Sequence, residues 1–460
     1  MKKLLTIIFI FISLQVQGTI YYISPTGNDK TGNGSIGNPW FSLEKAFYTL
    51  NPGDTCYIRG GVYYYDKVQY HHTIHDGKPN AHIYYINYPG EKPIFDFSKH
   101  IAPSVGSEVR GIYLYQSQYL EFEGITIRHL WQRLDNVNCF GFAGLASNYI
   151  KFTNCTAFDI SGGAFNFHNI DSLMIYNCDA YNCRDTLSAD TFSGNGGSGF
   201  SIKSDNETTQ LYAYVYGCRA WDCSDQGFSS TNEGPVIYEN CWSFRNGYAF
   251  PDAPYPIGQG WKFGFEDTEY AERRIINCVA AYNKESGFNT NGVYRSFKAE
   301  WYNNTSYHNG SGFYIYNTTS SDRNELLRVY RNNIAYANSD RPVALALNAI
   351  YTHDHNSWDI PITLTDNDFV SLDSTGISGP RKPDGSLPDL NGFLKLKAGS
   401  EAIDAGVDVG LPYFGKAPDL GAYEYDPEEG MNEYPAQASI IMHDGKIIKH
   451  LGKIIRLIKK

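Results

Sequence analysis

The residue whose type and spacing point most directly to chemistry is Lys262. It follows a Gly-x-Gly-aromatic step in Gly258-Gln259-Gly260-Trp261-Lys262. A lysine acts as a general base only when burial or neighbouring cations lower its pKa from about 10.4. Lys203, Arg245 or a bound Ca²⁺ could supply that positive charge. The alternative is an ordinary solvated surface lysine, and spacing alone leaves both readings open.

Lys262 belongs to a repeat that runs through the middle of the chain. In every repeat but the first, a Cys or Asn is followed five residues later by a second Cys or Asn. The first positions are Cys155, Cys178, Cys218, Cys241, Cys278, Asn304 and Asn333. The second positions are Cys183, Cys223, Asn246, Asn283, Asn309 and Asn338. A Gly-aromatic step then follows at Phe200, Phe228, Trp261, Phe288 and Phe313.

The period of this repeat predicts an all-β fold. Successive first-position Cys residues are separated by 23, 40, 23 and 37 residues, from subtraction of their numbers. A base period near 23 with insertions, in runs that alternate like strands, is typical of the coils of a parallel β-helix. We expect Phe41–Leu50, with Ser42 as N-cap and Pro52-Gly53 as its stop, to form a short helix that caps the N-terminal end.

Stacked coils would place equivalent residues in ladders about 4.8 Å apart. We expect the aromatic and Cys ladders to be interior, and the odd total of nine Cys favours free thiols. Residues after each interior aromatic should point outward. The first exposed column would be Ser201, Ser229, Lys262, Asn289 and Tyr314. The second would be Lys203, Thr231, Gly264, Asn291 and Tyr316.

These columns predict one polar patch bordered by Tyr314 and Tyr316. Its members would be Lys203, Asp225, Lys262, Asn289 and Asn291. Long insertions accompany it at Thr186–Gly196, Asp205–Gln210 and Tyr248–Gly258. Cations, amides and rings suit the carboxylates, hydroxyls and faces of a sugar-acid chain. Alternatively, Asp225 is an ordinary turn residue, and Asn289 and Asn291 are stacked turn amides.

The ends of the chain indicate export. Lys2 and Lys3, the apolar run Leu4–Leu14 and the small residues near Gly18 predict a signal peptide over residues 1–18, with secretion after cleavage near Gly18. We expect the β-helix with its N-terminal cap over 19–345 and C-terminal coils with a closing segment over 346–430. A basic tail occupies 431–460, as an amphipathic membrane-surface helix, a secretion or anchoring tail, or a frayed terminus.

Composition excludes several classes of protein. Aromatic residues make up 15% of the 460 residues and charged residues 19%, which is not a disordered composition. A net charge of −11 with no basic block in the body argues against nucleic-acid binding. Past the signal, no apolar run is long enough to span a membrane, so we expect a soluble monomer.

The segment from Gly196 to Phe313 resembles the right-handed parallel β-helix lyases of polysaccharide lyase family nine, which act on pectate or rhamnogalacturonan. The matching pieces are 199–203, 218–228, 239–247, 258–264 and 284–291, together with the opening 21–29. In that family the Lys after the Gly-x-Gly-aromatic step is the Brønsted base, which implies this role for Lys262.

The resemblance also implies a calcium site, from which this chain departs. Of the family's aspartate cluster only Asp225 is matched, while Ser198, Gln226 and Ser229 stand where further aspartates are expected. Asn289 replaces another nearby acid. Ca²⁺ prefers six to eight oxygens, several of them charged, so we expect any calcium site here to be weak.

The implied reaction is β-elimination on an acidic, pectic polysaccharide such as rhamnogalacturonan I or polygalacturonate. Lys262 would remove the C5 proton of a uronic acid, and Lys203, Arg245, Asn289 or Asn291 would stabilise the resulting enolate-like charge. One alternative is a glycoside hydrolase, which needs two acids about 5–10 Å apart; Asp225 with Asp222, Glu233 or Asp267 are the candidates. The other is a non-catalytic glycan-binding protein on the same scaffold.

Overall fold

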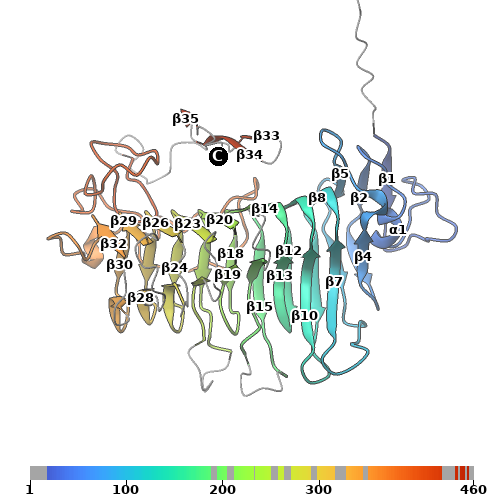
Figure 1. Ribbon diagram of the computed structural model, residues 1–460, viewed down its shortest axis with the longest axis horizontal. Coiled ribbons are helices and arrows are strands. Elements are labelled where there is room, and N and C mark those ends of the chain that lie inside the picture. Colours follow the sequence, from blue (N-terminus) through green and yellow to red (C-terminus); the bar gives the residue numbers. More distant parts are fainter. Residues whose placement is uncertain are drawn as a thin grey trace, which may run out of the picture.

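The computed structural model describes residues 18–187, 194–204, 212–232, 234–249, 257–263, 271–291, 298–315, 328–345 and 351–426, with short strands within 441–454. Almost all of its regular structure is parallel β-strand, wound into successive coils along the long axis (Figure 1). Each coil passes through three sheets in turn, which we call sheets 1, 2 and 3. The predicted all-β parallel β-helix is confirmed.

The strands of each sheet follow one another in stacking order. Sheet 1 contains β1 (Ile20–Ile23), β2 (Thr55–Ile58), β5 (Ile83–Asn87), β8 (Gln118–Glu123), β11 (Asn148–Thr153), β14 (Asp171–Tyr176), β17 (Ala213–Tyr216), β20 (Gly234–Glu239), β23 (Ala271–Ile276), β26 (Lys298–Tyr302), β29 (Arg328–Arg331) and β32 (Thr352–Asp354). Sheet 2 contains β3 (Gly61–Tyr64), β6 (Pro93–Asp96), β9 (Thr126–Leu130), β12 (Thr156–Ile160), β15 (Asp179–Cys183), β18 (Arg219–Trp221), β21 (Trp242–Phe244), β24 (Val279–Ala281), β27 (Thr305–Tyr307) and β30 (Ile334–Tyr336). Sheet 3 contains β4 (Gln69–His72), β7 (Glu108–Tyr115), β10 (Asn138–Leu145), β13 (Gly162–His168), β16 (Phe200–Ser204), β19 (Phe228–Asn232), β22 (Trp261–Phe263), β25 (Ser286–Asn289), β28 (Ser311–Ile315) and β31 (Arg341–Leu345).

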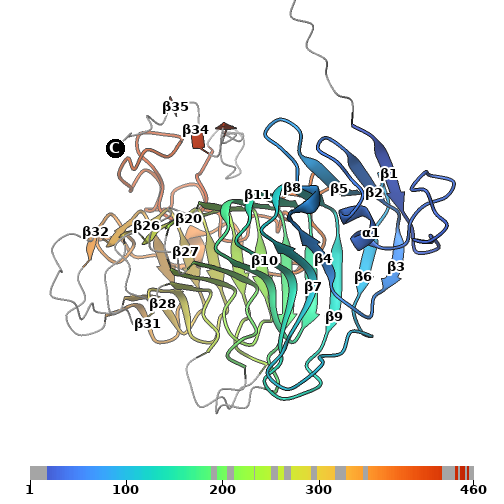
Figure 2. The ribbon, with the colours of Figure 1, turned by 45° about the vertical axis from the view of Figure 1, so that its right-hand side comes forward.

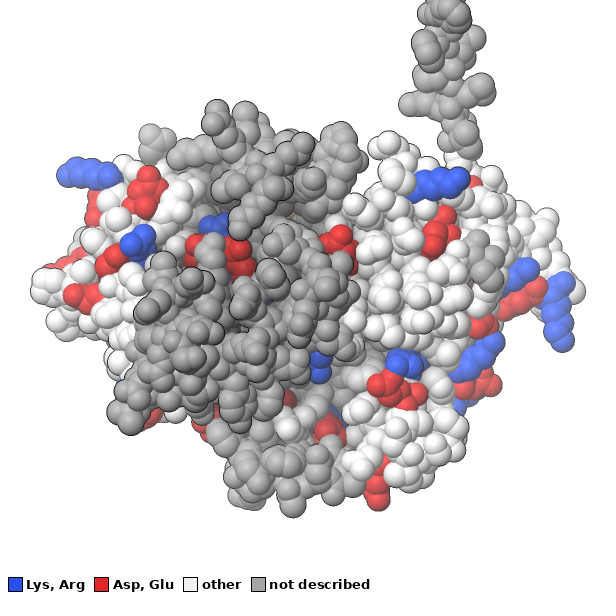
Figure 3. All heavy atoms as spheres, in the orientation of Figure 1, with Lys and Arg blue, Asp and Glu red and all other residues white. Residues whose placement is uncertain are grey.

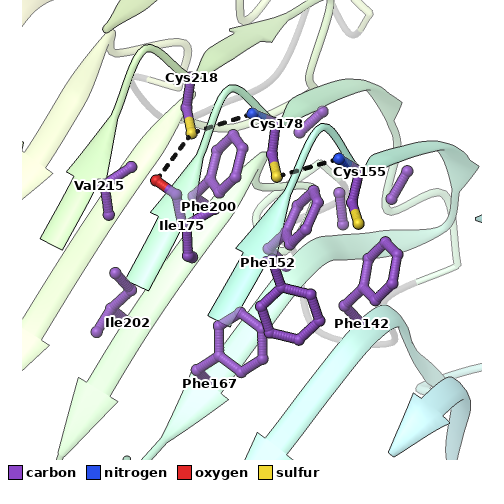
Figure 4. Close-up of a cluster of buried hydrophobic side chains, with 14 of the residues drawn as sticks. Phe142, Phe152, Cys155, Phe167, Ile175, Cys178, Phe200, Ile202, Val215 and Cys218 are labelled. Carbon is purple, nitrogen blue, oxygen red and sulfur yellow. Dashed lines mark hydrogen bonds between the residues drawn. The ribbon is translucent and has the colours of Figure 1, made fainter. Parts of the chain in front are cut away.

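The interior is filled by ladders of identical or similar side chains. Phe200, Phe228 and Trp261 are fully buried and stack face to face, with ring centroids 4.9 Å and 4.8 Å apart. Figure 4 shows part of this interior, where Cys155, Cys178 and Cys218 lie in a row beside the phenylalanines. All nine Cys are buried free thiols, as expected. Apolar burial of this extent is the main source of stability.

Two ladders of polar groups run along the corners of the coil. At the corner between sheets 2 and 3, Asn246 Nδ2 donates to Asn283 Oδ1 at 2.8 Å, and Asn283 Nδ2 donates to Asn309 Oδ1 at 2.9 Å. Each Oδ1 also accepts the backbone N–H of the preceding coil's Asn, as Asn283 Oδ1 does from Asn246 N at 3.2 Å. Either Cys or Asn can occupy a position in these ladders because both side chains accept that N–H. Cys155 N donates to Cys178 Sγ at 3.4 Å, and Cys223 N donates to Asn246 Oδ1 at 3.0 Å.

The residue before each ladder position turns the chain through the left-handed region. Asn154, Asn177, Asn240 and Asn277 have φ between 51° and 54°. Asn adopts this conformation more readily than other non-glycine residues, which explains the Asn-Cys pairs of the repeat.

The N-terminal end is closed by α1 (Leu43–Phe47), drawn beside the first strands in Figure 2. Ser42 Oγ accepts the Lys45 N–H, so the predicted N-cap is confirmed. Phe47 is buried and packs edge-on against Tyr85, at a centroid distance of 4.9 Å. The helix therefore covers apolar side chains that the first coil would otherwise expose.

The C-terminal segment, residues 356–426, runs back along the outside of the coil. It contains the short 3₁₀ helix η2 (Asp366–Asp368); a second, η1 (Thr73–His75), follows β4. Phe369, Phe393 and Leu396 of this segment pack on the outer face of sheet 2 with Trp242 and Phe244. Further along the chain, Leu411 joins a cluster on the outer face of sheet 1.

The tail forms strands where it is described, rather than the amphipathic helix that was one of the alternatives. These strands are β33 (Ile441–His443), β34 (Lys446–His450) and β35 (Lys453–Ile454), in a small antiparallel sheet. Among the described residues, no helix has the length and apolar character needed to cross a membrane.

Asn283→Ala should destabilise the protein strongly. It leaves the Asn246 backbone N–H without its acceptor and removes the donor to Asn309 Oδ1 in a dry interior, which we expect to cost about 3 kcal/mol in free energy of unfolding. Urea denaturation would measure the loss. Asn51→Ala, at an exposed site, is the control and should change stability by no more than about 0.5 kcal/mol. Equal effects of the two variants would show that the ladder is not a stabilising element.

Candidate active site

The outer face of sheet 3 carries Lys262 in the middle of an aligned column. Ser201 is opposite Ser229, Ser229 opposite Lys262, Lys262 opposite Asn289, and Asn289 opposite Tyr314. Trp261 fixes the direction of the Lys262 side chain, because its own ring is buried between Phe228 and Phe288 in the interior ladder. The predicted first column is therefore present in the predicted register.

The exposure of the first column differs from the prediction. Ser201, Ser229 and Asn289 are only 6%, 3% and 8% exposed, whereas Lys262 is half-buried. These small side chains have little solvent-exposed surface, so the expectation of an openly exposed column is wrong. A lysine at this position is long enough to reach past its shorter neighbours.

The second column is described only in part. Lys203 is exposed and lies opposite Thr231, two residues further along the strands than Ser201 and Ser229. Gly264 and Tyr316 lie outside the described residues. Asn291 follows β25 with φ 53°, and its N–H donates to Asn289 Oδ1 at 2.6 Å. The side-chain Oδ1 of Asn289 is therefore occupied by the turn. The Nδ2 group is the end of this amide that remains to donate to a ligand.

Asp225 lies beside the two lysines in the turn before β19. Its side chain is 2% exposed, and Oδ1 has no hydrogen-bond partner among the described residues. Burial raises the pKa of Asp225 to about 6, while the charges of Lys262 and then Lys203 act in the opposite direction. The structure thus brings Asp225, Lys262 and Lys203 into one electrostatic neighbourhood, as the sequence predicted.

Asp185 is a second buried acid near this site, and the sequence analysis missed it. It is 4% exposed, its negative charge raises the pKa of Asp225, and its Oδ1 accepts a hydrogen bond from Gln132 Nε2 at 2.7 Å. Its position two residues after the ladder residue Cys183, at the start of a long insertion, was the available signal.

The positions proposed to hold calcium do not fit that ion. Gln226 Nε2 donates to Ser198 Oγ at 2.9 Å, so two of the four groups bind each other. Ser229 contributes only a buried hydroxyl, which leaves Asp225 as the one carboxylate of the set. Among the described residues, no group of three or more His, Cys, Asp or Glu side chains is placed to hold a metal. This donor set lacks the charged oxygens that Ca²⁺ prefers.

Arg245 and Tyr314 lie at the margins of the site. Arg245 follows β21 at a corner with φ 55°, and its Nε and Nη2 both donate to the Asp222 carboxylate at 3.0 Å. It is therefore the corner residue of its coil and is not on the strands of sheet 3. The same ion pair engages Asp222, one of the acids considered for hydrolysis, while Glu233 and Asp267 lie outside the described residues. Tyr314 is half-buried on β28, two coils beyond Lys262.

Fold and site together define a parallel β-helix protein with a lysine-centred polar strip on one sheet. The sequence model described as "Pel9A-like, right handed beta helix region" matches residues 21–333. Pectate lyase L of Dickeya dadantii (strain 3937) is 30% identical over 424 residues, covering 88% of this chain and 90% of its own.

Two solved structures share the fold over most of their length. The crystal structure of pectate lyase Pel9A superposes with a TM-score of 0.72 at 28% identity, covering 89% of this chain and 96% of its own. A structure titled rhamnogalacturonan lyase gives a TM-score of 0.69 at 26% identity, covering 83% and 97%. This chain belongs to the Pel9A-like right-handed β-helix family, within polysaccharide lyase family nine, and is a polysaccharide lyase by class.

Asp225→Asn should raise the stability of the protein at neutral pH. The folded-state pKa of Asp225, about 6, lies above the ordinary aspartate value of 3.8, so the ionised carboxylate opposes folding increasingly as pH rises from about 4 through 6. The variant should gain about 1–3 kcal/mol at pH 7.5 and nothing near pH 4. Thermal unfolding at the two pH values would measure this.

Asp222→Asn is the matched control. Asp222 lies three residues before Asp225 in the same loop, but its carboxylate is ion-paired with Arg245. It should not stabilise the protein at pH 7.5. If Asp225→Asn were less stable than the wild type at pH 7.5, the ionised Asp225 carboxylate would be stabilising the folded protein, and the prediction would be wrong.

Proposed function

We propose that this protein is an exported lyase that cleaves a pectic uronan, such as rhamnogalacturonan I or polygalacturonate, by β-elimination. The observation that carries the proposal is the position of Lys262. It points out of sheet 3 from a strand whose neighbouring Trp261 is locked in the core, within a neighbourhood of Lys203, Asp225 and Asn289. Export is proposed from the sequence pattern of residues 1–18.

In the proposed reaction Lys262 Nζ takes the proton from C5 of a uronic acid unit. The electrons of the C5–H bond form the C4–C5 double bond, the C4–O bond breaks, and the departing oxygen takes a proton from water. Negative charge builds on the uronate carboxyl group as the proton leaves. Lys203 and the Asn289 Nδ2 are the cation and donor best placed on sheet 3 to stabilise it.

We further propose that the reaction does not depend on calcium. The Ser198–Gln226 hydrogen bond and the neutral Ser229 support this, because a set of four side chains with Asp225 as its one carboxylate should hold Ca²⁺ weakly. The positive charge of Lys203 then acts on the substrate carboxylate in place of a metal ion.

Lys262→Ala should abolish formation of unsaturated products, with a loss of about 10²–10⁴-fold or more in kcat. The assay follows ultraviolet absorbance on rhamnogalacturonan I and on polygalacturonate, each with calcium and with EDTA. Lys262→Arg keeps the charge but is not a base at neutral pH, so it should be equally inactive while retaining uronan binding. EDTA should leave the wild-type rate unchanged.

Lys151→Ala is the control, since Lys151 lies on the outer face of sheet 1 and pairs with Glu121 at 3.0 Å. It should retain full activity. Saturated reducing ends would support a hydrolase instead, and binding without any turnover by the wild type would support a glycan-binding protein. Activity that disappears in EDTA would overturn the proposed independence from calcium.

A further inference from the structure

The column that contains Lys262 continues towards the N-terminal coils. Ser201 is opposite Asn166, Asn166 opposite Ala143, Ala143 opposite Tyr113, and Tyr113 opposite Tyr70. Tyr113 is thus five coil steps from Lys262, about 24 Å at roughly 4.8 Å per step. The outer face of sheet 3 is one continuous strip between them.

Four rings occupy the N-terminal end of this strip, and we call them the ring array. They are Tyr70, His72, Tyr113 and Tyr115. Tyr70 stacks on Tyr113 at 5.4 Å and 17°, and His72 stacks on Tyr115 at 5.2 Å and 12°. All four are half-buried. The array ends abruptly on the side towards Lys262, because Tyr113 is followed in its column by the small Ala143.

A cation accompanies the ring array. The Arg110 guanidinium lies over the Tyr113 ring, with Cζ 4.2 Å from the ring centroid, and is ion-paired with Glu108. Between the array and Lys262 the second column contains Leu145, His168 and Lys203. Rings and an arginine therefore lie at the N-terminal end of the strip, and the exposed Lys203 lies near Lys262 at the other end.

The ring array differs from other aromatic ladders on outer faces of the coil. Phe158, Tyr181 and Trp221 stack along sheet 2, but the C-terminal segment packs against that ladder. Tyr176 and Tyr214 on sheet 1 lie in a cluster with Leu411 of the same segment. The ring array belongs to none of the hydrophobic clusters of the described residues.

We propose that the ring array with Arg110 is a remote subsite for the acidic sugar chain that Lys262 cleaves, an inference that rests on the proposed function. Partly exposed tyrosine rings offer apolar surface to the C–H faces of pyranose rings. The guanidinium group of Arg110 can donate a hydrogen bond to a uronate carboxylate. The subsite is continuous with the Lys262 column along one sheet face. A chain bound at both positions must span about 24 Å, so the enzyme prefers long polymers to short oligosaccharides.

The test separates binding from turnover. Affinity for polygalacturonate and for rhamnogalacturonan I is measured by affinity electrophoresis in the Lys262→Ala background, with and without Tyr113→Ala and Tyr115→Ala. The variant that carries both Tyr113→Ala and Tyr115→Ala should bind long polymers about tenfold more weakly. In the active enzyme the same two changes should raise KM on long polymers by a similar factor, leave kcat unchanged, and leave kinetics on oligosaccharides too short to reach the array unaffected.

The control is the pair Tyr57→Ala and Tyr88→Ala, which removes a comparable outer tyrosine pair away from sheet 3, with centroids 5.7 Å apart. It should change neither affinity nor KM. Unchanged polymer binding, or an equal loss on short and long substrates, would overturn the subsite. If the wild type forms no unsaturated product on any uronan, the proposed lyase function fails. The polymer-binding comparison still decides whether the ring array is a glycan site.

Discussion

The vertical register between coils is the constraint on which the rest of this structure depends. In a parallel stack each residue lies above its counterpart about 4.8 Å away, and a slip by one residue would turn every interior side chain outward. The corner ladders resist such a slip. Asn283 Oδ1 accepts both the backbone N–H and the Nδ2 of Asn246, so each amide locks its coil to the next by two hydrogen bonds in a dry interior.

The same register assembles the site. Lys203, Asp225 and Lys262 come from three different coils and are close only because each coil repeats the same path. The rigid ladder beneath them allows an unfavourable group to be retained. Asp225 is buried, its Oδ1 has no hydrogen-bond partner among the residues that the structure describes, and its pKa is raised, so its ionised form costs stability. The interior aromatic ladder, and the helix α1 that covers the N-terminal end, supply stability that offsets it.

The sequence was informative wherever one residue type recurs at one position of the coil. Such recurrence predicted the parallel β-helix, the buried free thiols, the interior aromatic ladder and the column around Lys262. Prediction was weaker where an outcome depends on what lies over a strand. Ser201, Ser229 and Asn289 face outward yet are buried, and strand alternation alone cannot show this. Arg245 looked like a cation for the site, but the left-handed corner and the Asp222 carboxylate take it away from sheet 3. Asp185 was missed because it is outside the aligned repeat, and only the folded chain places it near Asp225.

The path of the C-terminal segment distinguishes sheet 3, which carries Lys262, from the other two sheets. A three-sheet coil has three outer faces, and each could present a regular strip of side chains. In the described part of the chain, the C-terminal segment packs apolar residues onto sheet 2 and adds Leu411 to sheet 1. Arg381 ties this segment to the coil by donating to the Cys178 carbonyl and the Asp179 carboxylate. Where Figure 3 shows described residues, acidic and basic side chains are interspersed on this face. On the proposed strip of sheet 3, we expect local groups such as Lys203 and Arg110 to contribute more to recognition of an acidic chain than the net charge of −11.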